Sequence, residues 1–370
     1  MTGTKTQDNP FNPGFGRIPP LFLDREELTG NIAAGLDNIN SPYRTTLISG
    51  VRGCGKTVLM ADVCSAFASR RGWIVVNLST GPNLMRTLIS TLYDRAQPAI
   101  QKLFKSITGM KVSALGLQLE YDNKSPGPVS YQVILENMLR KLKQKKISLL
   151  VAIDEVSATE SVKEFSSIYQ IMLRENLDIA LIMTGLPKNI SELQNDEVLT
   201  FLLRSERIDL EPLSLYSIKQ KYRDAFENGG RSISEDATNR LTILSAGYAY
   251  AFQLLGFLIW ETGADTIDIP LIESIIPEFK TRLYRNVYTK IYEDMSPIDR
   301  QFVRAMAHSD LQDIPMRTIC ESLGKTNSYI SAYRKRLLDS QVITSAEYGT
   351  VRFSLPFFKD FVIERETLYG

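Results

Sequence analysis

The stretch GVRGCGKT, from Gly50 to Thr57, limits the possible folds of this chain more than any other part of the sequence. The buried-type run TTLIS precedes it, and apolar residues recur at helical spacing after it. A glycine, four further residues and then Gly-Lys-Thr form a turn whose backbone N–H groups point inward, at the start of a helix. Such a turn binds phosphate. The sequence therefore predicts a strand, a phosphate-binding loop and a helix in direct succession.

The loop residues have distinct expected roles in binding a nucleotide, which we take to be ATP or ADP. Lys56 would reach the β- and γ-phosphates, and Thr57 would place its hydroxyl group on Mg²⁺. We interpret Cys54 as a small residue of the loop with no redox role. The predicted nucleotide-binding residues of this segment are Gly50, Val51, Arg52, Gly53, Cys54, Gly55, Lys56, Thr57 and Val58.

A second motif, LLVAIDE, ends in the adjacent carboxylates of Asp154 and Glu155. Its apolar residues predict a buried strand, which we expect to neighbour the strand before the phosphate loop. Asp154 would hold Mg²⁺ through water, and Glu155 would polarise the attacking water. One carboxylate could be a helix cap. Two adjacent carboxylates in a chain with a phosphate loop indicate hydrolysis of the nucleotide.

Three further residues are candidates for contact with the γ-phosphate. Thr184 ends a predicted strand and could hydrogen-bond the phosphate or the water, or it could cap the helix that follows. Arg204 and Arg207 precede the next predicted strand. Either arginine could neutralise charge on the γ-phosphate of a neighbouring subunit, or it could serve only as a solvated surface residue.

Apolar runs alternate with helical patterns through the first two hundred residues, which predicts a parallel sheet covered on both faces. Helical patterns alone continue to about residue 290. Three short helices and two alternating runs then follow, which is the order of a winged helix-turn-helix. We expect an arm over residues 1–40, a nucleotide-binding α/β core over 41–210, a helical lid over 211–290 and a winged helix domain over 291–370.

The third helix of the last domain has the composition of a DNA recognition helix. From Lys325 to Arg336 it has four basic residues and no acidic one. Over residues 286–370, however, eleven basic and eleven acidic residues cancel. Either this surface enters a DNA major groove, or it packs on the nucleotide domain or a protein partner. The candidate DNA contacts are Lys325, Asn327, Ser328, Ser331, Arg334, Lys335 and, on the wing, Arg352.

Composition narrows the remaining functional classes. The 370 residues have a net charge of +1, so a nucleic-acid surface would have to be local. The single histidine, His308, nearly rules out catalysis by Ser/His/Asp and metal chemistry that needs several histidines, and three scattered cysteines fit a reducing compartment. No signal peptide or spanning run is evident, so we expect a cytoplasmic protein without a membrane partner.

The constellation of these motifs resembles the AAA+ ATPases, in particular the branch of origin-recognition initiators, archaeal ATPases and STAND-type ATPases. The segment LFLDREEL resembles the adenine-side segment of these families, which implies a nucleotide contact for Arg25. The segment beginning Gly247-Tyr248-Ala249 resembles the start of the lid helix in these families, which implies a nucleotide contact for Tyr248. This segment lacks the arginine that these families have at their second-sensor position, where it contacts the γ-phosphate. The resemblance therefore implies slow hydrolysis of ATP. The resemblance also implies a homo-oligomer with ATP between subunits.

Two functions remain open from the sequence. The first is an ATPase whose nucleotide state sets oligomerisation and the grip of the winged helix on duplex DNA, as in replication initiation or mobile-element functions. The second is a STAND-like signalling switch whose winged helix packs on the core or on a protein partner.

Overall fold

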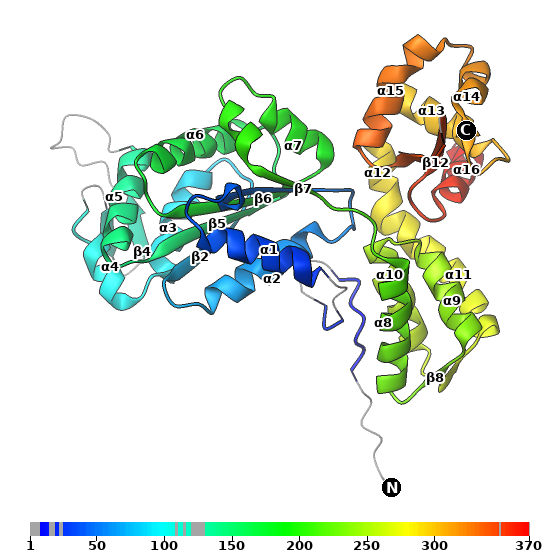
Figure 1. Ribbon diagram of the computed structural model, residues 1–370, viewed down its shortest axis with the longest axis horizontal. Helices are drawn as coiled ribbons and strands as arrows, with labels where there is room; N and C mark the ends of the chain where they lie inside the picture. Colours follow the sequence, from blue (N-terminus) through cyan, green and yellow to red (C-terminus); the bar gives the residue numbers. More distant parts are fainter. Residues whose placement is uncertain are drawn as a thin grey trace, which may run out of the picture. The chain divides into compact units, whose positions relative to one another are not determined.

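A computed structural model describes residues 8–14, 19–21, 25–107, 110–113, 116–119, 130–347 and 349–369 of the chain (Figure 1). The chain forms two compact units that alternate along the sequence. The sheet unit consists of Arg25–Ser49 and Leu59–Asp209, and the helical unit of Met1–Asp24, Gly50–Val58 and Leu210–Gly370.

Five parallel strands form the centre of the sheet unit, in the order β2-β5-β6-β1-β7. Every residue of β1 and β6 is buried. Since successive side chains of a strand point to opposite faces, both faces of the sheet are covered. This confirms the predicted α/β architecture. The strands are β1 (Thr45–Ser49), β2 (Trp73–Ser79), β5 (Ser148–Asp154), β6 (Ile179–Gly185) and β7 (Glu206–Asp209).

The helices of the sheet unit pack a continuous apolar core against these strands. Helices α3, α5 and α6 contribute buried residues such as Leu88, Met138 and Phe165 to one cluster with β5 and β6. The helices are α1 (Glu26–Asp37), α2 (Lys56–Ala68, which begins in the helical unit), α3 (Leu84–Arg95), α4 (Pro98–Phe104), α5 (Tyr131–Gln144), α6 (Glu160–Arg174) and α7 (Pro187–Gln194), with the 3₁₀ turns η1 (Pro42–Arg44) and η2 (Thr200–Arg204).

The strand order corrects one expectation from the sequence. The acidic strand β5 does not neighbour β1, because β6 lies between them and pairs with both. The apolar pattern of a strand shows that the strand is buried, but it does not determine the position of the strand in the sheet. The carboxyl end of β6, with Thr184, is therefore interposed between the ends of β1 and β5.

A small antiparallel hairpin accompanies the sheet unit. Strands β3 (Met110–Ser113) and β4 (Gly116–Leu119) pair with Met110 opposite Leu119. The alternating run over residues 111–121 predicts strand here. Leu115 and Tyr121 of that run lie outside the described residues.

In the helical unit, residues 210–293 form mainly helices. Two short parallel strands, β8 (Ser232–Ile233) and β9 (Thr266–Ile267), interrupt them, which the sequence did not predict. Phe11, from the amino-terminal arm, is buried here against the rings of Tyr222, Phe226, Phe252 and Trp260. The helices are α8 (Leu215–Asn228), α9 (Glu235–Ser245), α10 (Ala249–Glu261), α11 (Ile269–Leu283), the π-helical η3 (Tyr284–Tyr288) and α12 (Thr289–Glu293).

The remainder of the chain forms what we call the C-terminal module. Ser296 and Asp299 form a capping box at its first helix, which fixes where that helix begins. No helix among the described residues is sufficiently long and apolar to span a bilayer. The elements are α13 (Pro297–Ala307), β10 (Ile314–Pro315), α14 (Met316–Leu323), α15 (Asn327–Asp339), β11 (Ile343–Ser345), β12 (Thr350–Phe353) and α16 (Phe358–Tyr369).

Candidate nucleotide site

The segment from Gly50 to Gly55 forms a tight loop that ends where α2 begins at Lys56. Gly53 and Gly55 have φ angles of 75° and 98°, in the left-handed region that favours glycine. A Cβ atom at Gly53 would lie 2.3 Å from the hydroxyl oxygen of Tyr248, so no larger residue fits there without a shift. The glycine spacing thus produces the narrow turn at a helix amino terminus that a phosphate group needs.

Lys56 is folded into this loop and is only 9% exposed. Its ammonium group donates to the carbonyl oxygens of Gly50, at 2.9 Å, and Val51, at 2.8 Å. A lysine ammonium has three donors, and these two bonds fix its position inside the turn. The positive charge is therefore placed where phosphate oxygens would be bound.

Residues at the start of α10 hold the outer side of the loop. The Tyr248 hydroxyl donates to the carbonyl oxygen of Arg52, and the Tyr250 N–H donates to that of Gly53 at 3.1 Å. Burial, and to a smaller extent the nearby Cys54 and Tyr250, raises the pKa of Tyr248 well above its usual value. Tyr248 is therefore a neutral donor that shapes the loop from outside.

The acidic pair lies at the carboxyl edge of the sheet unit, next to the end of β6. The buried Thr184 donates its hydroxyl hydrogen to Asp154 Oδ1, and the Glu155 N–H donates to Asp154 Oδ1 at 2.9 Å and to Thr184 Oγ1 at 3.3 Å. The N-cap residue of α7 is Leu186, not Thr184, and no side chain caps that helix. Thr184 thus orients the acidic pair and does not cap α7. Glu155 itself is exposed, with its backbone at φ 52°.

The donors expected to hold Mg²⁺ have suitable chemistry. Asp154 offers a carboxylate and Thr57, in the first turn of α2, a hydroxyl group. Among the described residues no group of three or more His, Cys, Asp or Glu side chains could hold a metal ion. Mg²⁺ is usually bound by one or two carboxylates together with substrate phosphates and water, and Asp154 offers a donor of this kind.

The two candidate arginines differ in their surroundings. Arg207 donates to Asp209, at 3.1 Å, and to the side chains of Ser191 and Gln194. Arg204, at the end of η2, is exposed. Arg25 precedes α1 and is half-buried, while Phe22, Leu23 and Asp24 of the adenine-side segment lie outside the described residues.

The candidate DNA residues lie on α15 and on the ribbon after it. Arg334 donates to Ser345 at 3.2 Å, and Arg352 forms an ion pair with Asp313 at 2.6 Å. Both cations are thus partly neutralised or held within the module. The residues of this set that are exposed are Lys325, Asn327, Ser328, Ser331 and Lys335.

Two contacts of the loop come from residues that no sequence pattern singles out. Asp294, just after α12, pairs with Arg52 at 3.7 Å, and Gln341 of the C-terminal module accepts a hydrogen bond from the Val51 N–H at 3.2 Å. Neither belongs to a motif. Gln341 lies 290 residues from its partner, and no local pattern encodes so distant a contact.

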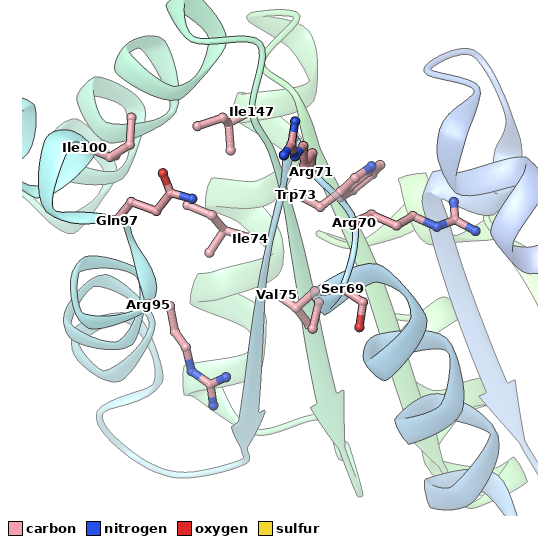
Figure 2. A pocket seen from close by; sticks show the side chains of 12 residues that line it. Ser69, Arg70, Arg71, Trp73, Ile74, Val75, Arg95, Gln97, Ile100 and Ile147 are labelled. Atoms are coloured by element: carbon pink, nitrogen blue, oxygen red, sulfur yellow. The ribbon is translucent and has the colours of Figure 1, made fainter.

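A cavity of about 390 Å³ lies at the beginning of β2, at the end of the sheet away from Asp154 (Figure 2). Its lining includes Arg71, Trp73, Arg95 and Gln97. None of the predicted site residues lines it, so it is separate from the nucleotide chemistry.

Family models match two parts of the chain. Residues 26–106 match the model described as mitochondrial ribosomal death-associated protein 3, and residues 285–362 match a domain of unknown function. No curated protein matches the sequence.

Solved structures match nearly the whole chain. A Walker-type ATPase of Pyrococcus abyssi has a TM-score of 0.62 and 18% identity, over 92% of this chain and 96% of that one. The ORC2 protein of Aeropyrum pernix, solved in ADPNP-ADP complexes, has a TM-score of 0.60 and 16% identity, over 96% and 98%. These likenesses confirm the predicted resemblance at the level of the fold. The chain has the α/β AAA+ fold of the Walker-type and origin-recognition ATPases.

Proposed function

We propose that this protein is a slow ATPase in which the bound nucleotide controls self-association and the binding of duplex DNA by the C-terminal module. The observation that carries the proposal is the phosphate loop, with left-handed Gly53 and Gly55 and with Lys56 buried at its centre. The orientation of Asp154 and Glu155 by Thr184 supports hydrolysis. The origin-recognition protein that shares the fold was solved with ADPNP and ADP.

Nucleotide chemistry is tested with two variants of the loop and the acidic strand. Lys56→Ala should weaken ATP binding by roughly 10- to 150-fold, the effect of a hydrogen bond to a charged group. Glu155→Gln should retain ATP binding and lose turnover, because the amide cannot polarise water. Calorimetric titration and phosphate release measure the two effects. Lys188→Ala, at a side chain 69% exposed, is the matched control. Normal hydrolysis by Glu155→Gln would remove this residue from the mechanism.

DNA binding is tested at Arg334 and Lys335. Changing both to Glu should weaken binding of duplex DNA and reduce its dependence on salt, because each lost phosphate contact lowers the salt slope by about 0.9. Arg317→Glu is the control, since it changes charge in the same module at a side chain 89% exposed on α14. Gel-shift titrations with ATP at several salt concentrations give both quantities. Absent or salt-insensitive binding by the wild-type protein would refute DNA recognition.

One contact favours the alternative of a STAND-like regulatory switch. Gln341 ties the C-terminal module to the phosphate loop, as a module that packs on its own nucleotide domain would do. A switch of this kind predicts protein that is purified with ADP bound and that has no affinity for DNA. Analysis of the nucleotide released on denaturation, beside the gel shifts, separates the two functions.

A further inference from the structure

Gln341 occupies a constrained turn directly after α15. Its φ angle is 55°, in the left-handed region, which is uncommon for a residue with a side chain. Its N–H donates to the carbonyl oxygen of Leu338 at 2.8 Å, and the N–H of Val342 donates to that of Leu337 at 3.1 Å. The turn is thus fixed to the last residues of α15 by backbone bonds, and the side chain of Gln341 leaves it from a defined position.

That side chain acts on the peptide groups of Val51. Gln341 Oε1 accepts from the Val51 N–H at 3.2 Å. The carbonyl oxygen of the same residue accepts from the Lys56 ammonium at 2.8 Å. Val51 is 8% exposed, so few other partners could replace the glutamine. The orientation of Val51, and through it the position of Lys56, therefore depends on Gln341.

Other residues that hold the loop come from the start of α10 and from the position just after α12. Tyr248 and Tyr250 hold the carbonyl oxygens of Arg52 and Gly53 from the start of α10, and Asp294 pairs with the Arg52 side chain. Gln341 differs from these residues because it belongs to the turn between α15 and β11. It is a direct link between the phosphate loop and the helix that carries the candidate DNA contacts.

We propose that Gln341 is a positioning residue of the phosphate site and that it couples phosphate binding to the carboxyl end of α15. The inference rests on the proposed binding of a nucleotide by the loop. Gln341 holds the loop in the shape that receives phosphate, so its loss weakens nucleotide binding. By reciprocity, a ligand that shifts the end of α15 changes nucleotide affinity by the same factor as the nucleotide changes affinity for that ligand.

The test uses the full chain with ADP as the probe. Gln341→Met keeps the length of the side chain and removes its acceptor. Gln341→Gly removes the side chain and, with it, the steric cost of the positive φ angle. This variant should therefore be at least as stable as the wild-type protein. Both should raise the ADP dissociation constant by roughly two- to twelvefold, the effect of one neutral hydrogen bond. Gln301→Met, at an exposed position on α13, is the matched control and should leave ADP affinity unchanged.

Amide hydrogen exchange supplies a second readout that a structural role alone would not change. Saturating ADP should slow exchange over residues 338–343 in the wild-type protein and in Gln301→Met. In both Gln341 variants this ADP-dependent protection should be lost although ADP is bound. Unchanged affinity with protection retained in the Gln341 variants would overturn this inference alone. Failure of the wild-type protein to bind ADP would refute the proposed function and the inference together.

Discussion

Glu155 combines an exposed carboxylate with a strained backbone. It follows the buried strand β5 directly and has a φ angle of 52°. Its N–H is held by Asp154 and Thr184, and the next N–H, of Val156, donates to the Thr184 carbonyl oxygen at 2.8 Å. These bonds maintain a conformation that a residue with a side chain otherwise avoids, as is common at functional sites. The same bonds fix the backbone position from which the Glu155 side chain extends.

This strain leads to a prediction about stability and activity. Glu155→Gly should raise the free energy of unfolding by about 0.5–1 kcal/mol, since glycine adopts a positive φ without a steric cost but loses more entropy on folding. It should also lose ATP hydrolysis. Lys146→Gly, at a residue with φ 56° outside the site, should stabilise the protein similarly and retain hydrolysis. Urea denaturation and phosphate release measure the two quantities, and a destabilised Glu155→Gly protein would contradict the account of strain.

Among the elements, α10 performs two tasks. Tyr248, just before the helix, and Tyr250, in its first turn, hold the phosphate loop, and the middle of the helix packs on Phe11 of the amino-terminal arm. Gly256 makes this packing possible, because a Cβ atom there would lie 2.3 Å from the Phe11 ring. Asn12 and Gln253 add a hydrogen bond of 2.8 Å beside the ring. The described residues 8–14 of the arm are thus an integral part of the helical unit.

Removal of the Phe11 ring should therefore be costly. Phe11→Ala should lower the free energy of unfolding by about 3–5 kcal/mol, since it opens a cavity among four aromatic side chains. Thermal unfolding, followed by circular dichroism, measures the change. Tyr216→Ala, at a side chain 72% exposed, should cost no more than about 0.5 kcal/mol. Equal melting temperatures for the two variants would show that the arm contributes no packing energy.

The sequence predicted strands better than it predicted contacts between distant segments. The bounds of β6 match the apolar run IALIMTG of the sequence, because a buried parallel strand is a nearly continuous apolar segment. The place of β6 between β1 and β5, and the docking of Phe11 on α10, carry no local pattern. In the site, glycine spacing and paired carboxylates pointed to the residues that we expect to touch phosphate or water. Gln341 acts through another residue and was missed.

At the scale of the whole molecule, the two units are interleaved along the chain. The chain changes unit after Asp24, Ser49, Val58 and Asp209. The phosphate loop belongs to the helical unit, although the strand before it belongs to the sheet unit. Neither unit is a continuous piece of sequence, so a simple truncation cannot isolate either one.

A prediction at this scale concerns Arg204 and self-association. If Arg204 completes the site of a neighbouring copy, Arg204→Ala and Glu155→Gln should each lack ATP hydrolysis alone, and their mixture should recover part of it. Arg207→Ala is the matched control, because Arg207 is bound to Asp209 and Gln194 of its own chain and should retain hydrolysis. Phosphate release from mixtures at several ratios is the measurement. A mixture as inactive as its components would exclude a role for Arg204 between copies.

The burial of Phe11 also sets when its segment can dock during synthesis, because its partners lie far along the chain. The aromatic residues that enclose its ring, from Tyr222 to Trp260, leave the ribosome long after it. At 5–20 residues per second the delay is roughly 10 to 50 s. During that interval the ring has no native partner and remains in water or on a chaperone. The segment around Phe11 is therefore translated well before the helices on which it docks.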